Sequence, residues 1–245
     1  MMIILALVTL TLIAGFLYWW LIIETEGVYL GRRVVVALYD LVAPRYDRIK
    51  QFDEQADLML ISQPIMSRLQ PLADPLILDV ATGTGRLPLL MARNASFQGH
   101  VIGLDASGRM LKRARQKVAA EHFVDFITLM RQDAGELPFP NDSFDAVTCL
   151  EALEFLPDPQ AALAEMVRVL RPGGTLLATI RIDTRWMPDR AWSEGKMRRE
   201  LEALAMCAIQ FQIWQDDYTQ VWARKAGDSP AVGAGKLAEV LASVS

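Results

Sequence analysis

The chain has 245 residues, 52% of them hydrophobic, and a formal net charge of −4. This length suits one α/β domain of ordinary size with an appendage, and the apolar content supports a substantial core. The acidic balance provides no broad positive field for phosphate backbones, which disfavours a nucleic-acid substrate and favours small molecules or lipids.

Residues 1–23 contain no charged side chain. At about 1.5 Å of rise per residue, this run is long enough to cross a hydrocarbon layer of roughly 30 Å. Tyr18, Trp19 and Trp20 near its end are of the types favoured at a membrane interface. The sequence therefore predicts a transmembrane anchor. A cleaved signal peptide is the first alternative, disfavoured by the long run, the uncharged start and the lack of a small-residue cleavage site, and a buried core helix is the second.

Basic residues are absent before the apolar run and frequent after it. They are Arg32, Arg33, Arg45, Arg48 and Lys50. Because Lys and Arg accumulate on the cytoplasmic side of membrane helices, we expect a single-pass protein whose main domain is cytoplasmic. Residues 24–74 connect the anchor to that domain. Their helical pattern, with breaks or kinks at Pro44 and Pro64, predicts helices that cover the domain.

From residue 75 on, short β-rich runs alternate with helical stretches, which is typical of a parallel sheet wrapped by helices. The predicted strands are 76–80, 101–104, 126–130, 146–150 and 175–180, and the predicted helices are 87–93, 108–120 and 160–170. Asp158 and Pro159 form a helix start, and Arg171 to Gly174 form a stop and turn. The predicted fold is a Rossmann-like, doubly wound α/β sheet.

After residue 180 the pattern predicts a loop, a helix over 194–206 and two strands at 209–214 and 218–223. The short acidic turn between these strands indicates an antiparallel hairpin that closes the sheet, so that the main domain spans 75–225. Residues 226–245 begin with Gly-Asp-Ser-Pro and continue with small residues. They predict a flexible tail with room for one short helix.

The two cysteines and two histidines give little sign of special chemistry. Cys149 and Cys207 both lie in apolar stretches, which predicts reduced, buried thiols and no disulfide framework. His100 and His122 have no cysteine or carboxylate beside them at metal-ligand spacing, so no metal site is predicted. Both histidines precede predicted strands, whereas open α/β sheets bind ligands at the opposite edge, where the strands end.

A glycine-rich turn follows the first predicted strand and leads into a helix. Gly83 and Gly85 allow a tight turn and let a ligand approach main-chain amides. Asp105 ends the next strand, about twenty residues further on, where a carboxylate accepts hydrogen bonds from a ribose. These features indicate a ligand that contains adenosine. NAD is disfavoured because the third glycine of the dinucleotide pattern is missing and the turn instead reaches Pro88.

The order of these motifs resembles the class I S-adenosylmethionine-dependent methyltransferases over roughly residues 39–225, and in particular the branch of ubiquinone and menaquinone biosynthesis. The resemblance rests on Asp79 to Gly85, Gly103 to Asp105, Gln132 to Phe139, Asn141 to Asp145 and Val169 to Gly174, and on Tyr39-Asp40 and Ala43 to Asp47. The last two match an N-terminal signature that folds over the cofactor in that branch.

The resemblance implies S-adenosyl-L-methionine as the cofactor. It implies that Gly83 and Gly85 pass close to the methionine part and that Asp79 orients its amino group. Asp105 would hold the ribose hydroxyls, and Asp133 with the Ala134 amide would bind the adenine. The predicted cofactor-binding residues are Asp79, Ala81, Gly83, Gly85, Asp105, Ala106, Asp133 and Ala134.

Methyl transfer is an in-line displacement at a sulfonium carbon, so placing the acceptor and excluding water supply much of the catalysis and a base is optional. Tyr46 in the cover and Glu151 after the fourth strand are the predicted catalytic residues. For Cys149 a core position, and for Glu154 a solvated helix face, is the simpler interpretation.

Two functions stay open. The first is methyl transfer to a small hydrophobic acceptor, such as a membrane lipid, quinone or related isoprenoid. The second is a methyltransferase-like structural or assembly subunit of a membrane complex, suggested by the absence of an evident base and by the membrane helix. An NAD-dependent oxidoreductase is a weaker alternative because of Pro88.

Overall fold

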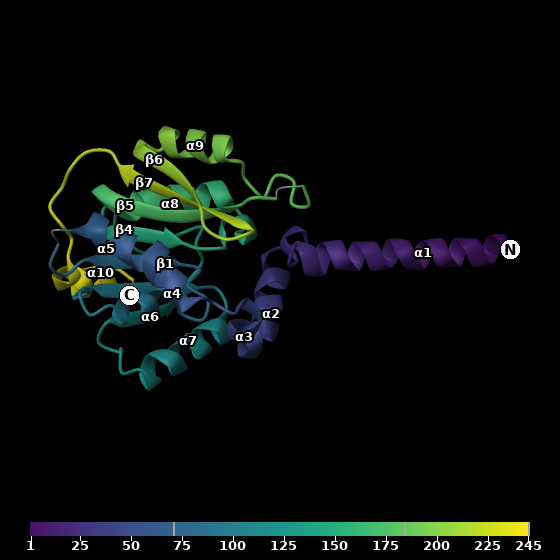
Figure 1. The fold of residues 1–245 in the computed structure, drawn as a ribbon, viewed down its shortest axis with the longest axis horizontal. Helices are drawn as coiled ribbons and strands as arrows, with labels where there is room; N and C mark the ends of the chain where they lie inside the picture. Colours follow the sequence, from purple (N-terminus) through teal and green to yellow (C-terminus); the bar gives the residue numbers. More distant parts are fainter. Residues whose placement is uncertain (71, 184, 245) are drawn as a thin grey trace.

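A seven-stranded sheet forms the centre of the computed structural model, which describes residues 1–70, 72–183 and 185–244. Its strands are β1 (Leu76–Val80), β2 (His100–Asp105), β3 (Ile127–Arg131), β4 (Phe144–Cys149), β5 (Leu170–Arg181), β6 (Met206–Ile213) and β7 (Tyr218–Lys225). They lie in the order β3-β2-β1-β4-β5-β7-β6. β1 to β5 are parallel, whereas β7 runs antiparallel to both β5 and β6. The predicted Rossmann-like sheet closed by an antiparallel hairpin is confirmed (Figure 1).

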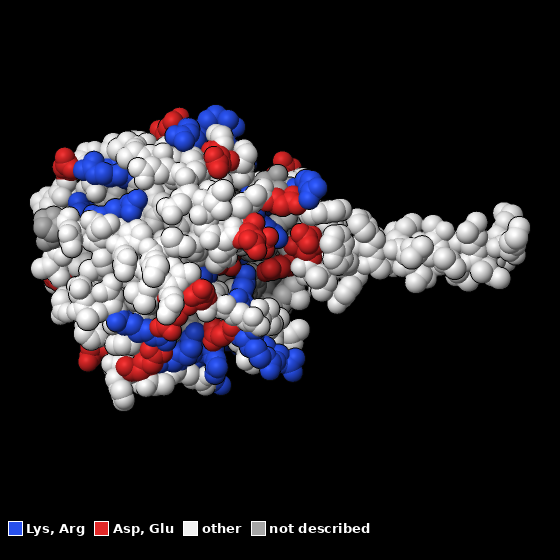
Figure 2. Space-filling view, viewed as in Figure 1, with Lys and Arg blue, Asp and Glu red and all other residues white. Residues whose placement is uncertain are grey.

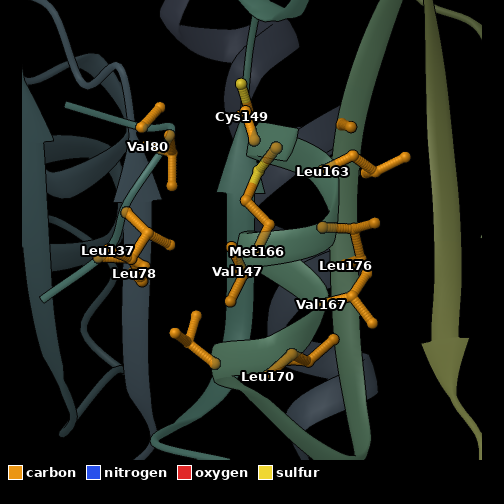
Figure 3. Close-up of a cluster of buried hydrophobic side chains, with 14 of the residues drawn as sticks. Leu78, Val80, Leu137, Val147, Cys149, Leu163, Met166, Val167, Leu170 and Leu176 are labelled. Carbon is orange, nitrogen blue, oxygen red and sulfur yellow. The ribbon is translucent and has the colours of Figure 1, made fainter. Parts of the chain in front are cut away.

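Helices cover both faces of the sheet, which explains why its central strands are apolar on both sides. The helices after β1 are α6 (Arg86–Ala92), α7 (Gly108–Ala120), α8 (Pro159–Val169), α9 (Glu194–Ala203) and α10 (Leu237–Ala242). α6 packs over Ile77 on one face, and α8, α9 and α10 pack on the other, over Leu78. Figure 3 shows Leu163 and Met166 of α8 among the strand side chains of this second layer.

The bounds of α8 follow from its sequence. The carboxylate of Asp158 accepts a hydrogen bond from the amide of Ala161 at 3.0 Å, and Pro159 occupies the first turn, where its missing N–H costs little. The helix ends at Val169, but Arg171 to Gly174 lie inside β5 instead of forming the predicted separate turn. A register shift between β4 and β5 accommodates them, so the chain passes directly from helix to strand.

Asp145 fixes the start of the central strands. Its buried carboxylate accepts hydrogen bonds from the side chain of Arg171 and from the amides of Leu76, Val232 and Gly233, at 2.7 to 3.0 Å. The last two amides belong to the C-terminal tail. The predicted short helix of that tail corresponds to α10, and the docking of the tail on Asp145 was not foreseen from the sequence.

Helices also connect the N-terminal segment to β1. Within the described residues 25–70, the α-helices are α2 (Arg32–Val42), α3 (Tyr46–Lys50), α4 (Glu54–Asp57) and α5 (Gln63–Leu69). Pro44 lies in the short turn between α2 and α3, as predicted. Pro64 does not break the chain, because it lies in the first turn of α5, directly after a wide helical turn at Leu58–Ser62. The carbonyl of Leu60, whose usual amide partner Pro64 lacks, accepts a hydrogen bond from Gln220 at 3.0 Å instead.

An apolar helix projects from this domain. α1 (Met2–Tyr18) continues through the turn Trp19–Glu24, and within the described residues Met2–Glu24 is the one helix long and apolar enough to cross a membrane, with a mean hydropathy of 2.3. None of its residues is buried, so the alternative of a buried core helix is wrong. Figure 2 shows no charged side chain along the projecting part, whereas acidic and basic groups intermingle on the visible face of the domain. Length and composition alone fit an anchor or a signal sequence.

Candidate functional site

An open cleft lies where β1, β2 and β4 end, beneath the cover helix α2, and its space, open solvent included, is about 740 Å³. A second space, of about 390 Å³ with open solvent included, adjoins it and shares Tyr46, Gly83 and Glu151 with it. Ligands of open α/β sheets bind at this carboxyl edge, where the strand order reverses between β1 and β4. Nearly all the predicted site residues line one or both spaces. They are Tyr46, Asp79, Ala81, Gly83, Asp105, Ala106, Asp133, Ala134 and Glu151.

The exception, Gly85, has a packing role. Its φ of +82° places it in the left-handed region before α6, and a β-carbon added there would lie 3.2 Å from the β-carbon of Ala114 in α7. Gly83 has a φ of +55° and open space where its β-carbon would be. Gly83 therefore lets a ligand approach the turn, whereas Gly85 lets the turn approach α7.

Asp105 joins the glycine turn to β2. One carboxylate oxygen accepts a hydrogen bond from the Gly83 amide at 2.8 Å and the other from the Ser107 amide at 2.7 Å. Burial raises the pKa of this carboxyl group, and the two amides partly offset that effect. The spacing of the glycines and Asp105 in the sequence predicts that they bind a ligand together. The structure shows that the acid also holds the turn in shape.

Asp79 is buried beneath the same turn. Its Oδ1 accepts a hydrogen bond from the hydroxyl of Thr148 at 2.7 Å, and the residue lines the smaller space beside Tyr46. Burial raises the pKa of Asp79 to about 6, while the hydrogen bond from Thr148 acts in the opposite direction. Such a carboxyl group gains from a cationic ligand, because the ligand would compensate the charge that burial disfavours.

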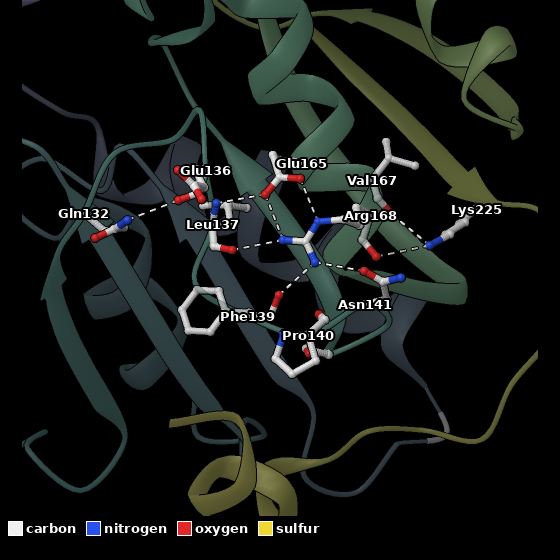
Figure 4. A network of polar contacts seen from close by, with 11 residues as sticks. Gln132, Glu136, Leu137, Phe139, Pro140, Asn141, Glu165, Val167, Arg168 and Lys225 are labelled. Carbon is white, nitrogen blue, oxygen red and sulfur yellow. Dashed lines mark hydrogen bonds and ion pairs between the residues drawn. The ribbon is translucent and has the colours of Figure 1, made fainter. Parts of the chain in front are cut away.

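The loop after β3 carries Asp133 and Ala134. α8 fixes this loop, since Arg168 donates to the carbonyls of Leu137 and Phe139, and Glu165 accepts from the Leu137 amide (Figure 4). Asp133 forms an ion pair of 2.5 Å with Arg32 of α2. This pair links the wall of the larger cavity to its cover.

Two aspartates clamp the cover onto the domain. Asp40 of α2 accepts hydrogen bonds from the Ser107 hydroxyl at 2.5 Å and the Arg109 amide at 3.1 Å, at the start of α7. Asp47 of α3 accepts from the Thr84 hydroxyl at 2.5 Å and from Lys117 at 3.1 Å. Both belong to the sequence signature of the cover, which thus contains the contacts that hold it in place.

Glu151 is held by two cations. Its carboxylate lies 2.8 Å from Lys50 and 2.6 Å from Arg86, and Arg86 also forms a two-pronged pair with Asp57. Burial opposes its ionisation, but Lys50 and Arg86 outweigh burial and keep the pKa of Glu151 below its usual value. Glu151 is therefore a fixed carboxylate at neutral pH. The guanidinium of Arg86 in turn lies 4.0 Å from the ring centre of Phe52.

Tyr46 lines both spaces from the cover side. Burial raises the pKa of its phenol well above the usual range, and the nearby carboxylate of Glu151 adds to this. The phenol is thus neutral at physiological pH. It can donate or accept a hydrogen bond in the cavity, but it does not provide a phenolate base.

Two predictions about single residues were wrong. Cys207 is exposed, because β6 is the edge strand of the sheet, whereas Cys149 is buried as predicted. Glu154 is only 2% exposed, since the turn Leu153–Phe155 directs it inward, where it accepts a hydrogen bond from the Tyr218 hydroxyl at 2.7 Å. Burial raises the pKa of Glu154 to about 7, and the Tyr218 hydrogen bond acts against that rise.

The predicted position of the histidines is confirmed. His100 begins β2, at the edge remote from the cavity, and its ring contacts the Thr128 hydroxyl and the Asp125 carbonyl. His122 lies in the turn between α7 and β3. Within the described part of the chain, no group of His, Cys, Asp and Glu could hold a metal ion.

Arg32 and Arg86 are site residues that sequence reasoning missed. From the sequence, Arg32 is assigned only to the basic flank of the apolar run, and Arg86 is assigned no role. Their partners, Asp133 and Glu151, lie 101 and 65 positions away, respectively, so no local pattern could pair them.

Residues 78–178 match the family model of a methyltransferase domain. A demethylmenaquinone methyltransferase of Lactiplantibacillus plantarum is 37% identical over 143 residues, which cover 58% of this chain and 60% of that relative. The alignment thus spans about three fifths of the relative's length. The predicted resemblance to methyltransferases of quinone biosynthesis is confirmed for this part of the chain.

Solved structures confirm the fold. The (4+2)-cyclase SpnF has a TM-score of 0.66 at 19% identity, covering 79% of this chain and 96% of that chain. An S-adenosylmethionine-dependent methyltransferase from Aquifex aeolicus has a TM-score of 0.57 at 21% identity, covering 72% and 96%. At these identities the two neighbours show only that the fold is shared. The reaction has to be inferred from the residues that line the cavity.

Proposed function

We propose that the chain is a membrane-anchored methyltransferase that moves a methyl group from S-adenosyl-L-methionine to a small hydrophobic acceptor of the quinone or isoprenoid lipid type. The observation that carries this proposal is the cavity at the end of β1, β2 and β4, where an open glycine turn converges with four acidic residues, Asp79, Asp105, Asp133 and Glu151. The match of residues 78–178 to a methyltransferase domain supports the same reaction.

The residues present fit this cofactor. Gly83 leaves room for the methionine part, and the buried carboxyl group of Asp79 suits its ammonium group. Each carboxylate oxygen of Asp105 accepts one main-chain hydrogen bond, from Gly83 or from Ser107, so each retains a lone pair for a ribose hydroxyl. We assign the adenine to the wall formed by Ala106, Asp133 and Ala134.

When bound, the cofactor supplies an electrophilic methyl group on a sulfonium sulfur. The part of this chain is to place the acceptor in line with that methyl group and to exclude water. We propose that the neutral phenol of Tyr46 orients the acceptor through a hydrogen bond. The carboxylate of Glu151, fixed by Lys50 and Arg86, faces the same space and accepts a hydrogen bond from an acceptor hydroxyl.

The character of the cavity favours an apolar acceptor. α2 contributes Val35 and Val36, and the opposite wall contributes Phe155 and Leu156. The name of the relative, a demethylmenaquinone methyltransferase, indicates a quinone-type acceptor in that protein. Because α2 follows the anchor within a few residues, we infer that this apolar wall lies near the bilayer, and the basic residues after the anchor favour a cytoplasmic domain.

The test has two arms. Calorimetry on the purified chain should show binding of S-adenosylmethionine and S-adenosylhomocysteine, and Asp105→Ala should weaken both by roughly 10- to 100-fold, since a hydrogen bond to a charged group contributes about 1.5 to 3 kcal/mol. Asp125→Ala, at an exposed position remote from the cavity, is the matched control. Circular dichroism checks that both variants fold.

The second arm supplies membranes with methyl-labelled S-adenosylmethionine and asks where the label appears. Label in a lipid-extractable quinone or isoprenoid supports the proposed acceptor. A folded wild-type chain that binds no cofactor would instead favour the structural or assembly subunit.

A further inference from the structure

The end of the apolar helix Met2–Glu24 that adjoins the domain packs against a segment that lies far away in the sequence. The ring of Trp186 lies edge-on to Trp19, with ring centres 5.3 Å apart, and 6.4 Å from the ring of Phe16. The indole N–H of Trp20 donates to the Trp186 carbonyl at 2.8 Å. Residues 185–192, which follow β5, therefore lie beside the last turns of the apolar helix, as Figure 1 also shows.

A second set of contacts fixes this segment to the domain. Tyr29, stacked on Trp20, donates to the Pro188 carbonyl at 2.7 Å. Met187 is buried in a small core with Val35 of the cover helix α2. The anchor, the cover and residues 185–192 thus form one packed unit, and the position of the anchor determines where Trp186 lies.

The depth of Trp186 follows from helix geometry. The helix Met2–Glu24 has 23 residues and a length of roughly 34 Å, slightly more than the roughly 30 Å hydrocarbon layer. If this helix spans the layer, the hydrocarbon boundary lies close to Trp19 and Phe16 lies inside it. Trp186 contacts both, so its ring crosses the boundary.

The exposure of the segment suits that depth. Trp186 is 40% exposed although it already packs against two aromatic rings, and Ile182, just before it, is 49% exposed. Water would contact this apolar surface, whereas the interface between headgroups and hydrocarbon is where indole rings are most favourable. Arg185, with a side chain that is 81% exposed, would reach the headgroups.

We propose that residues 185–192, together with Ile182, form a second membrane contact, which inserts Trp186 beside α1 into the interface of a phospholipid bilayer. This contact would hold the domain at a defined angle, with α2 and the cavity beneath it beside the membrane surface. The inference rests on the proposed anchoring of α1, and its test distinguishes the two.

The experiment places one nitroxide label at a time on the full chain in phosphatidylcholine and phosphatidylglycerol vesicles. Exposed Cys207 is first changed to Ser, while Cys149 stays because it is buried. Labels are then attached at Trp186→Cys, at Phe16→Cys within the anchor, and at Val124→Cys, an exposed apolar site in the turn after α7. Collision of each label with oxygen, which concentrates in lipid, and with a water-soluble nickel complex reports its depth.

We expect the label at position 186 to resemble that at position 16, with at least a several-fold lower nickel collision rate than the label at position 124. If position 186 is as accessible to nickel as position 124 while position 16 is protected, the second contact does not exist although the anchor does. If all three positions are accessible, both the contact and the proposed anchoring are overturned. A label at Ile182→Cys repeats the measurement with Trp186 intact, so that loss of the indole cannot explain a negative result.

Discussion

A single residue, Asp79, should make cofactor affinity depend on pH. Burial holds the pKa of its carboxyl group at about 6, so the group is mostly protonated at pH 5 and ionised at pH 7. If the ionised form binds the cofactor's ammonium group, affinity for S-adenosylhomocysteine should rise about tenfold from pH 5 to pH 7. Calorimetry across this range tests it, with Asp79→Asn as the variant that should bind weakly and lose the slope. A flat profile in the wild type would show that Asp79 does not contact a cation.

Glu154 gives the folding stability a pH dependence, and its contribution to the free energy of unfolding falls as pH rises. Its pKa is about 7 in the folded protein against a usual value of 4.5, so between these pH values the folded state keeps a proton that the unfolded state has lost. Its contribution is therefore fully present below pH 4.5 and decreases as pH rises to about 7, by on the order of 3 kcal/mol.

Glu154→Gln, which stays neutral, should become more stable relative to the wild type as pH rises from 5 to 8. Denaturant unfolding of both proteins in the same detergent measures the difference in unfolding free energy at each pH. A constant difference would mean that Glu154 does not titrate in this range.

At the scale of one element, we predict that the two glycines of the turn between β1 and α6 differ in their effects on binding and stability. Gly83→Ala should weaken cofactor binding with a small loss of stability, because the added β-carbon points into open space and only the positive φ is costly, by about 1 kcal/mol. Gly85→Ala should lose more stability, because it adds a close contact with Ala114 to the same backbone strain. Thermal unfolding and calorimetry on both variants separate the two effects. Equal melting temperatures would show that the contact between the turn and α7 relaxes freely.

The position of the cover helices depends on contacts with residues that are distant in the sequence. The helices of residues 24–74 were predicted from apolar spacing, and their general place over the site from a resemblance. What holds them there are single pairs with distant partners, such as Asp40 with Ser107 and Asp47 with Thr84. A carboxylate in a sequence does not identify its partner, because that choice depends on which helices the sheet brings together.

At the scale of the whole molecule, we predict that the anchor is needed for methylation of an acceptor in a membrane. Deleting residues 1–15 removes most of α1 but leaves the aromatic contacts of Phe16, Trp19 and Trp20 with Trp186. The truncated chain should bind the cofactor with unchanged affinity. Its methylation of an acceptor dissolved in vesicles should fall at least tenfold, because tethering raises the effective concentration of a lipid-dissolved acceptor.

The same truncation with an acceptor dissolved in detergent micelles is the control, and there the two chains should differ little. Equal rates on vesicles would mean that α1 serves localisation or assembly and does not deliver the acceptor.

The sequence by itself determined the class of this molecule. The alternation of β-rich and helical runs predicted the sheet, because strands buried on both faces must be apolar throughout. The spacing of Gly83 and Asp105 predicted the binding edge, because Gly83 follows one parallel strand and Asp105 ends its neighbour. Only the tertiary structure decided that Gly85 packs against Ala114, that Glu154 is buried, and that Arg86 fixes Glu151. Each of these depends on a partner far away in the chain, and a local pattern contains no information about which side chains the folded sheet brings within a few ångströms of each other.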